Sequence, residues 1–293
     1  MISPRFERNL GFLSTEEQER LHGSSVAIAG VGGDGGMLAI QLARMGVGSM
    51  RFADPDPFEI ENINRQATCR DSTLGVNKAE AVAEYAQDIN PELKIEVFKE
   101  GITSENAGLF VAGQDLLVDE TEYTMQHLAV MLAREARKEG IPNMTALNIA
   151  FAAVVTTYSA DGPSLEKRLG FEDDTPIEEI MATEADLSRW LPYLPKYGDI
   201  EVLQKIATGE KSAPSIAPGV AMAAALGATQ AFVNLTADVG NKRPKPVTAP
   251  KALVVDAITG KSNIIRYNRV SHFRHLGHMV ARNVLKLNPS TSY

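Results

Sequence analysis

Apolar residues along this chain follow two spacings, and the first half of the sequence switches regularly between them. Short apolar runs that predict buried strands lie at 25–30, 49–54, 94–99 and 114–120. Stretches with helical spacing follow them, at 35–46, 76–89, 104–110 and 123–139. The S-x-x-E pattern of Ser14 and Glu17 predicts one more helix before the first strand. Strands that alternate with helices predict a parallel sheet with helices on both faces.

The pattern changes after Pro142. Residues 144–160 predict two adjacent strands without a helix between them, and residues 251–268 predict a hairpin. A helix of small residues is expected over 219–235, whereas 161–214 is polar, contains prolines and is helical in patches. We therefore expect an α/β fold with a Rossmann-like mixed sheet, whose first half is parallel and whose continuation is antiparallel.

The length and the 44% content of hydrophobic residues are enough for one large domain with a substantial core. We interpret residues 1–293 as a single domain. Its parts would be a nucleotide-binding core at 1–160, an insertion or lid at 161–215, and a helix and hairpin at 216–293 that complete the fold.

The charge balance and the apolar runs exclude several classes of protein. A formal net charge of -8 argues against electrostatic nucleic-acid binding, which needs concentrated Lys and Arg. The amino terminus lacks the apolar core of a signal peptide, and Gly, Thr and Gln interrupt the most apolar later run. We expect a cytoplasmic protein with no nucleic-acid partner and no membrane association.

The stretch "GVGGDGG" joins the first predicted strand to the following helix. Its five glycines are Gly30, Gly32, Gly33, Gly35 and Gly36. Backbone N–H groups at such a helix start bind anions, and glycines allow a phosphate to approach closely. Asp54 ends the next strand, where a carboxylate accepts hydrogen bonds from ribose hydroxyls. These features suit NAD, FAD or ATP, with a ligand-free turn as the structural alternative.

Asp34 stands in the middle of this loop, where a carboxylate would repel a phosphate. It either interacts with the positive end of the helix dipole and faces away from the ligand, or it faces the phosphates with a compensating cation. The sequence leaves both arrangements open.

The segment after Asp54 favours a triphosphate over a dinucleotide. It contains two amides and two cations at Asn62, Gln66, Arg65 and Lys78. Such groups neutralise and orient phosphates better than they serve hydride transfer. A solvated loop, with the amides as local caps, is the alternative for each residue.

The stretches "GVGGDGG", "ADPDPFEIENINRQ" and "LGVNKAE" together resemble the nucleotide motifs of the E1-like adenylating enzymes, the ThiF, MoeB and HesA family related to ubiquitin-activating enzymes. The resemblance covers at least residues 5–125 and resumes more weakly at 217–237. Asn62, Asn64, Arg65 and Gln66 match the middle motif, which this chain departs from at Phe58, Glu61 and Ile63.

The resemblance implies an adenylation domain in which ATP lies across the carboxyl ends of the strands and a substrate carboxylate attacks the α-phosphorus. Gly30 to Gly36 would pack against the nucleotide and Asp54 would hold the ribose. Phosphate contacts would come from Asn62, Arg65, Gln66 and Lys78. The substrate would be the C-terminus of a ubiquitin-like carrier, a peptide or a small molecule. "RFERN" resembles an element whose second arginine, here Arg8, acts in trans, which implies a homodimer.

The family's D-x-T-D-N element is replaced here by "DETEY". Glu122 occupies the place of the later aspartate, so the resemblance implies Mg²⁺ held by Glu122 with Asp119 beside it. Because glutamate is longer and Mg²⁺ tolerates little geometric error, a catalytically degenerate scaffold that binds a nucleotide or a partner is the alternative. A NAD-dependent oxidoreductase explains the glycine loop but not the Asn-Arg-Gln segment.

The family's paired zinc motifs are absent, because Cys69 is the only cysteine; we expect no structural zinc. Cys69 is either a reactive residue near the phosphates or a small buried loop residue. We interpret His272, His275 and His278 as a solvated helix face. Trp190 belongs to a hydrophobic satellite or to a flap over the substrate channel.

Overall fold

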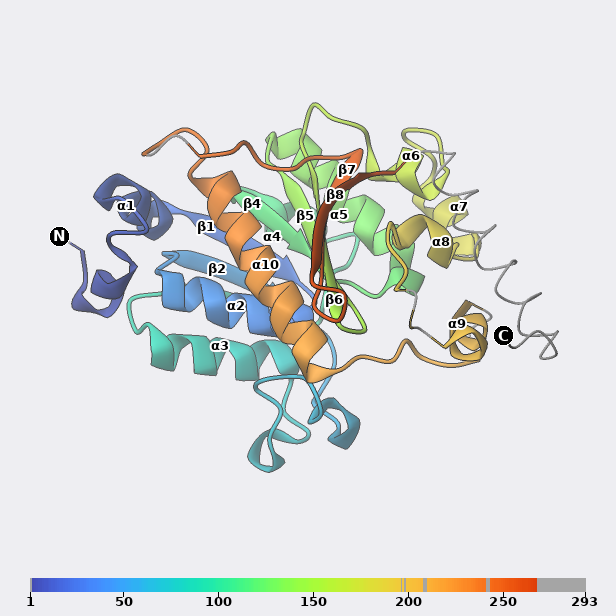
Figure 1. Ribbon diagram of the computed structural model, residues 1–293, viewed down its shortest axis with the longest axis horizontal. Helices are drawn as coiled ribbons and strands as arrows, with labels where there is room; N and C mark the ends of the chain where they lie inside the picture. Colours follow the sequence, from blue (N-terminus) through green and yellow to red (C-terminus); the bar gives the residue numbers. More distant parts are fainter. Residues whose placement is uncertain (1, 196, 198, 208–209, 241–242, 268–293) are drawn as a thin grey trace, which may run out of the picture.

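An eight-stranded mixed sheet organises the computed structural model, which describes residues 2–195, 197, 199–207, 210–240 and 243–267 (Figure 1). The strands are β1 (Ser25–Ala29), β2 (Ser49–Ala53), β3 (Lys94–Phe98), β4 (Leu116–Asp119), β5 (Asn143–Ile149), β6 (Ala152–Tyr158), β7 (Lys251–Asp256) and β8 (Lys261–Arg266). Their order across the sheet is β3-β2-β1-β4-β5-β6-β7-β8. Neighbours from β3 to β5 are parallel and those from β5 to β8 antiparallel, which confirms the predicted fold class.

Helices cover both faces of the parallel half. The α-helices of the described residues are α1 (Thr15–Gly23), α2 (Asp34–Met45), α3 (Lys78–Ile89), α4 (Ala107–Val111), α5 (Gln126–Glu139), α6 (Leu165–Leu169), α7 (Ile177–Ala182), α8 (Leu187–Trp190), α9 (Ile200–Ala207) and α10 (Ala217–Leu235). Apolar side chains of α2, α3 and α10 form the main core on one face, and those of α4 and α5 pack on the other. Helix α10 approaches closely, because a Cβ on Gly227 would lie 2.6 Å from Leu38 and 2.7 Å from Ala146.

Several predicted helices begin later than the apolar pattern indicates. The helix predicted from 76 starts at Lys78, because Asn77 caps it by accepting a hydrogen bond from the Glu80 N–H at 3.1 Å. Residues Tyr123–Met125 form a short 3₁₀ turn before α5. The predicted capping box of α1 is confirmed, since Ser14 and Glu17 each accept the other's backbone N–H.

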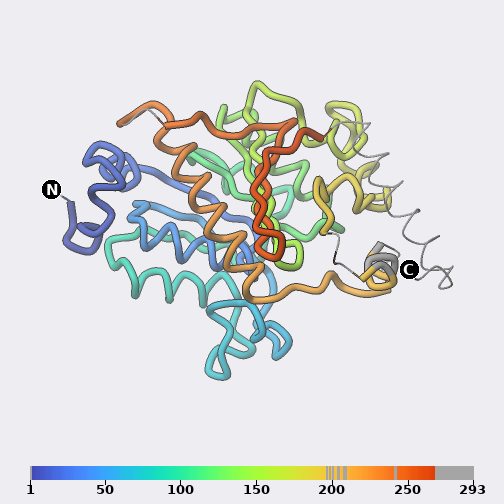
Figure 2. Tube along the Cα trace, in the orientation of Figure 1, coloured from blue at the N-terminus to red at the C-terminus, as the bar shows by residue number. Residues whose placement is uncertain are grey.

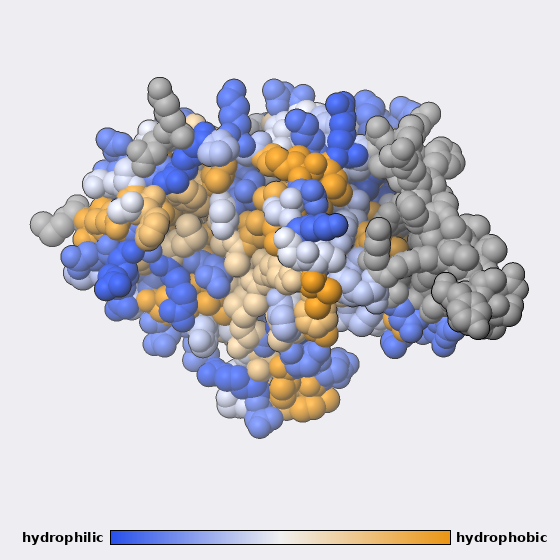
Figure 3. All heavy atoms as spheres, in the orientation of Figure 1, coloured by the Kyte–Doolittle hydropathy of each residue, from blue (hydrophilic) through white to orange (hydrophobic). Residues whose placement is uncertain are grey.

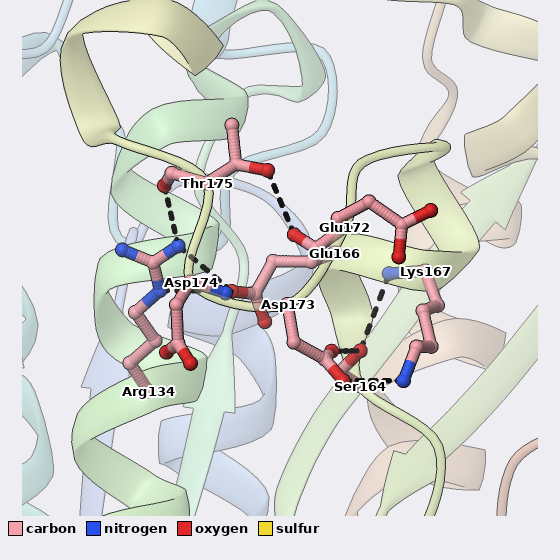
Figure 4. Close-up of polar contacts among 8 residues, drawn as sticks. All are labelled: Arg134, Ser164, Glu166, Lys167, Glu172, Asp173, Asp174 and Thr175. Atoms are coloured by element: carbon pink, nitrogen blue, oxygen red, sulfur yellow. Dashed lines mark hydrogen bonds and ion pairs between the residues drawn. The ribbon is translucent and has the colours of Figure 1, made fainter.

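Residues 161–215 hold α6 to α9 and pack beside the antiparallel half of the sheet. Figure 4 shows the first part of this segment, residues 164–175, bound to Arg134 of α5 by polar contacts. Arg134 donates to Glu166 at 2.9 Å and to the Thr175 carbonyl at 2.6 Å, while Ser164 donates to Asp173 at 2.5 Å. This part of the insertion is therefore a packed layer; the three-part division of the chain stays a prediction.

A separate apolar cluster joins the insertion to β6 and β7. Trp190 packs against it together with buried residues such as Leu169, Ile180 and Val254. Of the two interpretations of Trp190, this packing favours the hydrophobic satellite. His272, His275 and His278 lie outside the described residues. In the described part of the chain, no helix combines the length and apolar character that crossing a membrane needs.

Candidate active site

The carboxyl ends of β1 and β4 are where the sheet order changes direction. β1 is flanked by β2 on one side and by β4 on the other, so the chain crosses over in opposite directions on either side of this point. Ligands of open α/β sheets bind in the crevice at such a switch point. The glycine loop follows β1 at this position, and its last three residues begin α2.

The glycines of the loop divide into two groups. A Cβ added to Gly30 would lie 2.4 Å from the Glu120 carbonyl oxygen. A Cβ added to Gly35 would lie 2.0 Å from the Gly30 carbonyl oxygen, and a Cβ added to Gly36 would lie 2.6 Å from the Val31 carbonyl oxygen. These three positions let β1, β4 and α2 pack closely, as backbone atoms occupy the space of a side chain. At Gly32 and Gly33 the nearest atoms are instead side chains, at 3.5 Å and 3.3 Å.

The loop after β2 folds back onto the glycine loop. A Cβ added to Gly32 would contact the Gln66 side chain, and a Cβ added to Gly33 would lie 3.9 Å from Arg65 Cγ. Gln66 is 5% exposed, and its Oε1 has no hydrogen-bond partner among the residues that the structure describes. The Arg65 guanidinium donates to the Glu61 carbonyl at 3.1 Å and to Asn64 at 2.9 Å. The tertiary structure therefore brings Arg65 and Gln66 to the loop's open positions.

Asp54, Asn62 and Lys78 have local partners at the same edge. Asp54 is buried and accepts hydrogen bonds from the backbone N–H groups of Val31 at 2.9 Å and Asp56 at 3.1 Å. Burial raises the pKa of Asp54, against the attraction of Lys78. Lys78 Nζ lies 3.0 Å from Asp56. Asn62 Oδ1 accepts from the Glu59 N–H at 3.1 Å, which shapes the loop as the local-cap interpretation expects.

Asp34 turns away from the loop and towards β5. It is the first residue of α2, and its Oδ2 accepts hydrogen bonds from the backbone N–H of Asn148 at 3.0 Å and from Asn148 Nδ2 at 2.7 Å. Its Oδ1 is buried and has no hydrogen-bond partner in the described part of the chain. Burial raises the pKa of Asp34 to about 6, although the Asn148 bonds act in the opposite direction.

Asn148 also ties the insertion to this network. Ser215 donates to its Oδ1 at 3.0 Å, and Asn64 donates to the Ser215 carbonyl at 3.0 Å. Residues 210–216, which run from α9 to α10 (Figure 2), are thereby attached to both the loop after β2 and the end of β5.

Glu120 is a second acidic residue behind the glycine loop. Its Cβ lies 3.3 Å from the Cβ position of Gly35, and its Oε1 accepts the Ala146 N–H at 2.7 Å. Burial, and after it the charge of Asp34, raise its pKa well above the ordinary value. Sequence reasoning missed Glu120 and Asn148. The alternation of side chains along a strand could have indicated Glu120, because it places Asp119 and Glu120 on opposite faces of the sheet at the end of β4.

Asp119 and Glu122, the expected Mg²⁺ ligands, differ in exposure. Asp119 is buried, and its Oδ1 accepts a hydrogen bond from the Thr121 hydroxyl at 2.7 Å, whereas its Oδ2 has no hydrogen-bond partner within the described residues. Burial raises its pKa to about 6. Glu122 is exposed and precedes the 3₁₀ turn. Within the described residues, no group of three His, Cys, Asp or Glu side chains is placed to hold a metal ion.

Comparison with known proteins identifies the family. The model of the ThiF family matches residues 6–274. The chain belongs to the ThiF family.

Known proteins of this kind resemble the chain over part of their length. The SAMP-activating enzyme E1 of Haloferax volcanii is 34% identical over 149 residues, which are 50% of this chain and 54% of that protein. The tRNA threonylcarbamoyladenosine dehydratase of Bacillus subtilis is 34% identical over 147 residues, 50% of this chain and 57% of that protein. The chain thus spans little more than half the length of these relatives.

A solved structure of E. coli MccB with ATP shares the fold, with a TM-score of 0.64 and 20% sequence identity. The match covers 86% of this chain and 67% of MccB. At this coverage the shared fold includes part of the antiparallel half of the sheet as well as the parallel half.

Arg8 of this ThiF-family chain lies far from its own glycine loop. The 3₁₀ helix Pro4–Asn9 packs through Phe6 against Gly46, at the carboxyl end of α2. The loop is at the other end of α2, whose length is about 18 Å at 1.5 Å per residue. Arg8 is exposed there.

Cys69 is buried in the loop after β2. It is 6% exposed, and its Sγ lies 3.5 Å from the Glu59 carbonyl oxygen. Burial raises the pKa of the thiol, despite the opposing charges of Lys78 and Arg65. The small buried loop residue is therefore the interpretation that the geometry favours.

Proposed function

We propose that this ThiF-family chain is an ATP-dependent adenylyltransferase, which activates a substrate carboxylate as an acyl adenylate and releases pyrophosphate. The placement of Arg65 and Gln66 against Gly32 and Gly33 carries the proposal. A cation and a buried amide, whose oxygen has no hydrogen-bond partner among the described residues, meet there at the switch point of the sheet. These are groups that phosphates and hydroxyls of a nucleotide would satisfy.

In the proposed reaction, a carboxylate oxygen of the substrate attacks the α-phosphorus of ATP. The new bond joins that oxygen to phosphorus, and the bond between the α-phosphorus and the pyrophosphate oxygen breaks. A carboxylate needs no general base, so the demand on the protein is to align two anions and to offset charge on the phosphate oxygens. Arg65 and Lys78 would supply the positive charge, with Asn62 and Gln66 beside them. Asp54 would accept the ribose hydroxyls.

Mg²⁺ would enter the site with ATP. Such ions are commonly held by one or two carboxylates together with substrate phosphates. Glu122 is exposed, so it would be a carboxylate that contacts the ion. Asp119, which accepts hydrogen bonds from the Thr121 N–H and hydroxyl, would position the turn that presents Glu122, and a direct bond from its buried Oδ2 to the ion would require that atom to become accessible. The bound ion would supply charge stabilisation on the transferring phosphate.

We propose that the acyl group leaves the adenylate without passing through an enzyme thioester. Cys69 is buried and its thiol is held in the neutral form, which makes it a poor nucleophile. A nucleophile from outside the chain would therefore take the acyl group directly.

A homodimer in which Arg8 reaches the partner's nucleotide is part of the proposal. Arg8 is exposed and lies at the end of α2 opposite its own glycine loop, so it could serve only a second copy. The substrate would be a ubiquitin-like carrier, a peptide or a small carboxylate. Figure 3 shows apolar side chains over α10 and the β7–β8 hairpin, where Ile258 and Ile264 are 58% and 59% exposed, and such a face suits a protein or peptide partner.

The test is pyrophosphate-dependent exchange of label into ATP with a panel of carboxylates. Arg65→Ala should lower exchange by about a hundredfold, the usual effect of removing one preorganised stabilising group. Arg44→Ala, which removes an exposed arginine of α2, is the matched control and should leave exchange unchanged.

A degenerate scaffold that binds a nucleotide or a partner is the second candidate, because Glu122 replaces the family aspartate and Lys78 is engaged with Asp56. ATP binding without exchange for any carboxylate would favour the scaffold. Tight NADH binding without ATP affinity would refute the adenylyltransferase and support the oxidoreductase.

A further inference from the structure

Asn148 lies near the end of β5, and both ends of its side-chain amide are engaged. Its Nδ2 donates to Asp34 Oδ2 at 2.7 Å, and its Oδ1 accepts a hydrogen bond from the Ser215 hydroxyl at 3.0 Å. The backbone N–H of Asn148 donates to the same Asp34 oxygen at 3.0 Å. Because an ionised carboxylate can only accept hydrogen bonds, Asp34 determines which end of the amide faces it and directs Oδ1 towards Ser215.

Ser215 connects Asn148 to the loop after β2. Its carbonyl oxygen accepts a hydrogen bond from Asn64 Nδ2 at 3.0 Å. At the other end of that amide, Asn64 Oδ1 accepts a hydrogen bond from the Arg65 guanidinium at 2.9 Å. The guanidinium also donates to the Glu61 carbonyl oxygen at 3.1 Å. A continuous series of hydrogen bonds therefore runs from Asn148 to the guanidinium of Arg65.

The two ends of this series lie beside the glycine loop. Asp34 is the first residue of α2, and the residue before it is Gly33. A Cβ added to Gly33 would lie 3.9 Å from Arg65 Cγ and 3.3 Å from Val220 Cγ2, in the first turn of α10. The series therefore links the start of α2 to the cation at the open positions of the loop.

The segment that carries Ser215 is held by packing as well as by hydrogen bonds. It leads into α10, where a Cβ added to Gly219 would lie 2.0 Å from the Ala150 carbonyl oxygen. Ala150, in the turn between β5 and β6, has a φ of 56°, which residues other than glycine seldom adopt. Such a backbone conformation persists where the surrounding structure holds it. Ser215 is thus a fixed partner for Asn148.

We propose that Asn148 is a positioning residue for ATP: without touching the nucleotide, it holds Arg65 in the orientation that contacts the phosphates. The inference rests on the proposed function, in which Arg65 supplies positive charge to those phosphates. An arginine side chain has many rotamers, so one that is already held in place loses less freedom when its ligand binds. Asp34 then serves the site from behind, because its carboxylate orients the Asn148 amide.

The test is ATP binding by the full-length protein, measured by calorimetry near neutral pH with Mg²⁺ and without a carboxylate substrate. Asn148→Ala should weaken binding by about tenfold, the loss expected when a charged hydrogen bond to a phosphate is misplaced. Arg65→Ala should weaken it at least as much. The double variant should bind no more weakly than Arg65→Ala alone, because Asn148 acts through Arg65. Asn263→Ala, at an exposed asparagine of β8, is the matched control and should bind like the parent.

Ser215 gives a second test that leaves β5 unchanged. Ser215→Ala removes the hydroxyl that donates to Asn148 and should weaken ATP binding by about fivefold, the effect of one neutral hydrogen bond. Ser215→Thr keeps a hydroxyl and should restore the affinity of the parent. Thermal unfolding shows which variants are folded, and the two Ser215 variants decide the question if Asn148→Ala does not fold.

The outcomes separate this inference from the proposed function. A parent protein that binds no ATP would refute the proposed function, and the role of Asn148 with it. If the parent binds ATP, the inference alone is overturned when the folded alanine variants of Asn148 and Ser215 keep the parent's affinity. It is also overturned when Asn148→Ala weakens binding by the same factor whether or not Arg65 is present, because the effect then does not pass through Arg65.

Discussion

Replacing Asp34 by asparagine should stabilise the protein at neutral pH, although it removes a residue at the centre of the glycine loop. Burial raises the pKa of Asp34 from 3.8 to about 6. The folded state therefore binds this proton more tightly than the unfolded chain does. Stability must then fall as the pH rises from about 4 to about 6, and it must stay lower above that range.

The size of the effect follows from the same pKa difference. Each pKa unit corresponds to about 1.4 kcal/mol, so keeping Asp34 ionised in the folded protein costs about 3 kcal/mol at neutral pH. An asparagine oxygen can still accept the two Asn148 hydrogen bonds, and its amide adds no negative charge beside Glu120. Asp34→Asn should therefore recover up to about 3 kcal/mol near pH 7.5 and almost nothing near pH 4.

Thermal unfolding without ligand, followed between about pH 4 and about pH 8, measures this difference. A gain of about 3 kcal/mol corresponds to a rise in Tm on the order of 5–10 °C for a domain of this size. Asp88→Asn is the matched control, since Asp88 is exposed and should change stability by no more than about 0.5 kcal/mol. A variant that is less stable than the unchanged protein near pH 7.5, or a difference independent of pH, would refute the reasoning.

Three further predictions concern the loop, the cysteine and the insertion. Gly35→Ala should strongly destabilise or unfold the protein in a thermal melt, because its Cβ would lie 2.0 Å from a backbone oxygen. Gly32→Ala should melt like the parent, because its Cβ would be in ordinary contact, 3.5 Å from the nearest atom. The Gly32 variant should nevertheless bind ATP more weakly, as measured by calorimetry. Cys69→Ser should retain pyrophosphate exchange, and loss of exchange in a folded variant would show that the thiol takes part. Arg134→Gln should lower the free energy of unfolding by about 3 kcal/mol, because it leaves the buried Glu166 carboxylate without its cation; a denaturant titration with an unchanged midpoint would contradict this.

The order of strands and helices could be predicted from the sequence because apolar spacing and capping residues act within a few positions of the chain. The antiparallel continuation was predicted for the same reason, since 144–160 contains two apolar runs with no helical spacing between them. The strand order was not available from spacing, because it depends on pairing such as that of Ala29 with both Ala53 and Asp119.

The sequence alone determined that a glycine loop follows the first strand and that Asp54 ends the second. It also determined which residue types near this loop could contact phosphates. Turn chemistry and local periodicity fix these features. Only the tertiary structure decided where Asp34 points. Its partner Asn148 is 114 residues away, and a carboxylate at the start of a helix turns towards whichever donors the neighbouring strand presents. The same packing places Glu120 behind the loop. Successive residues of a strand point to opposite faces of the sheet, and the elements that cover each face come from remote parts of the chain.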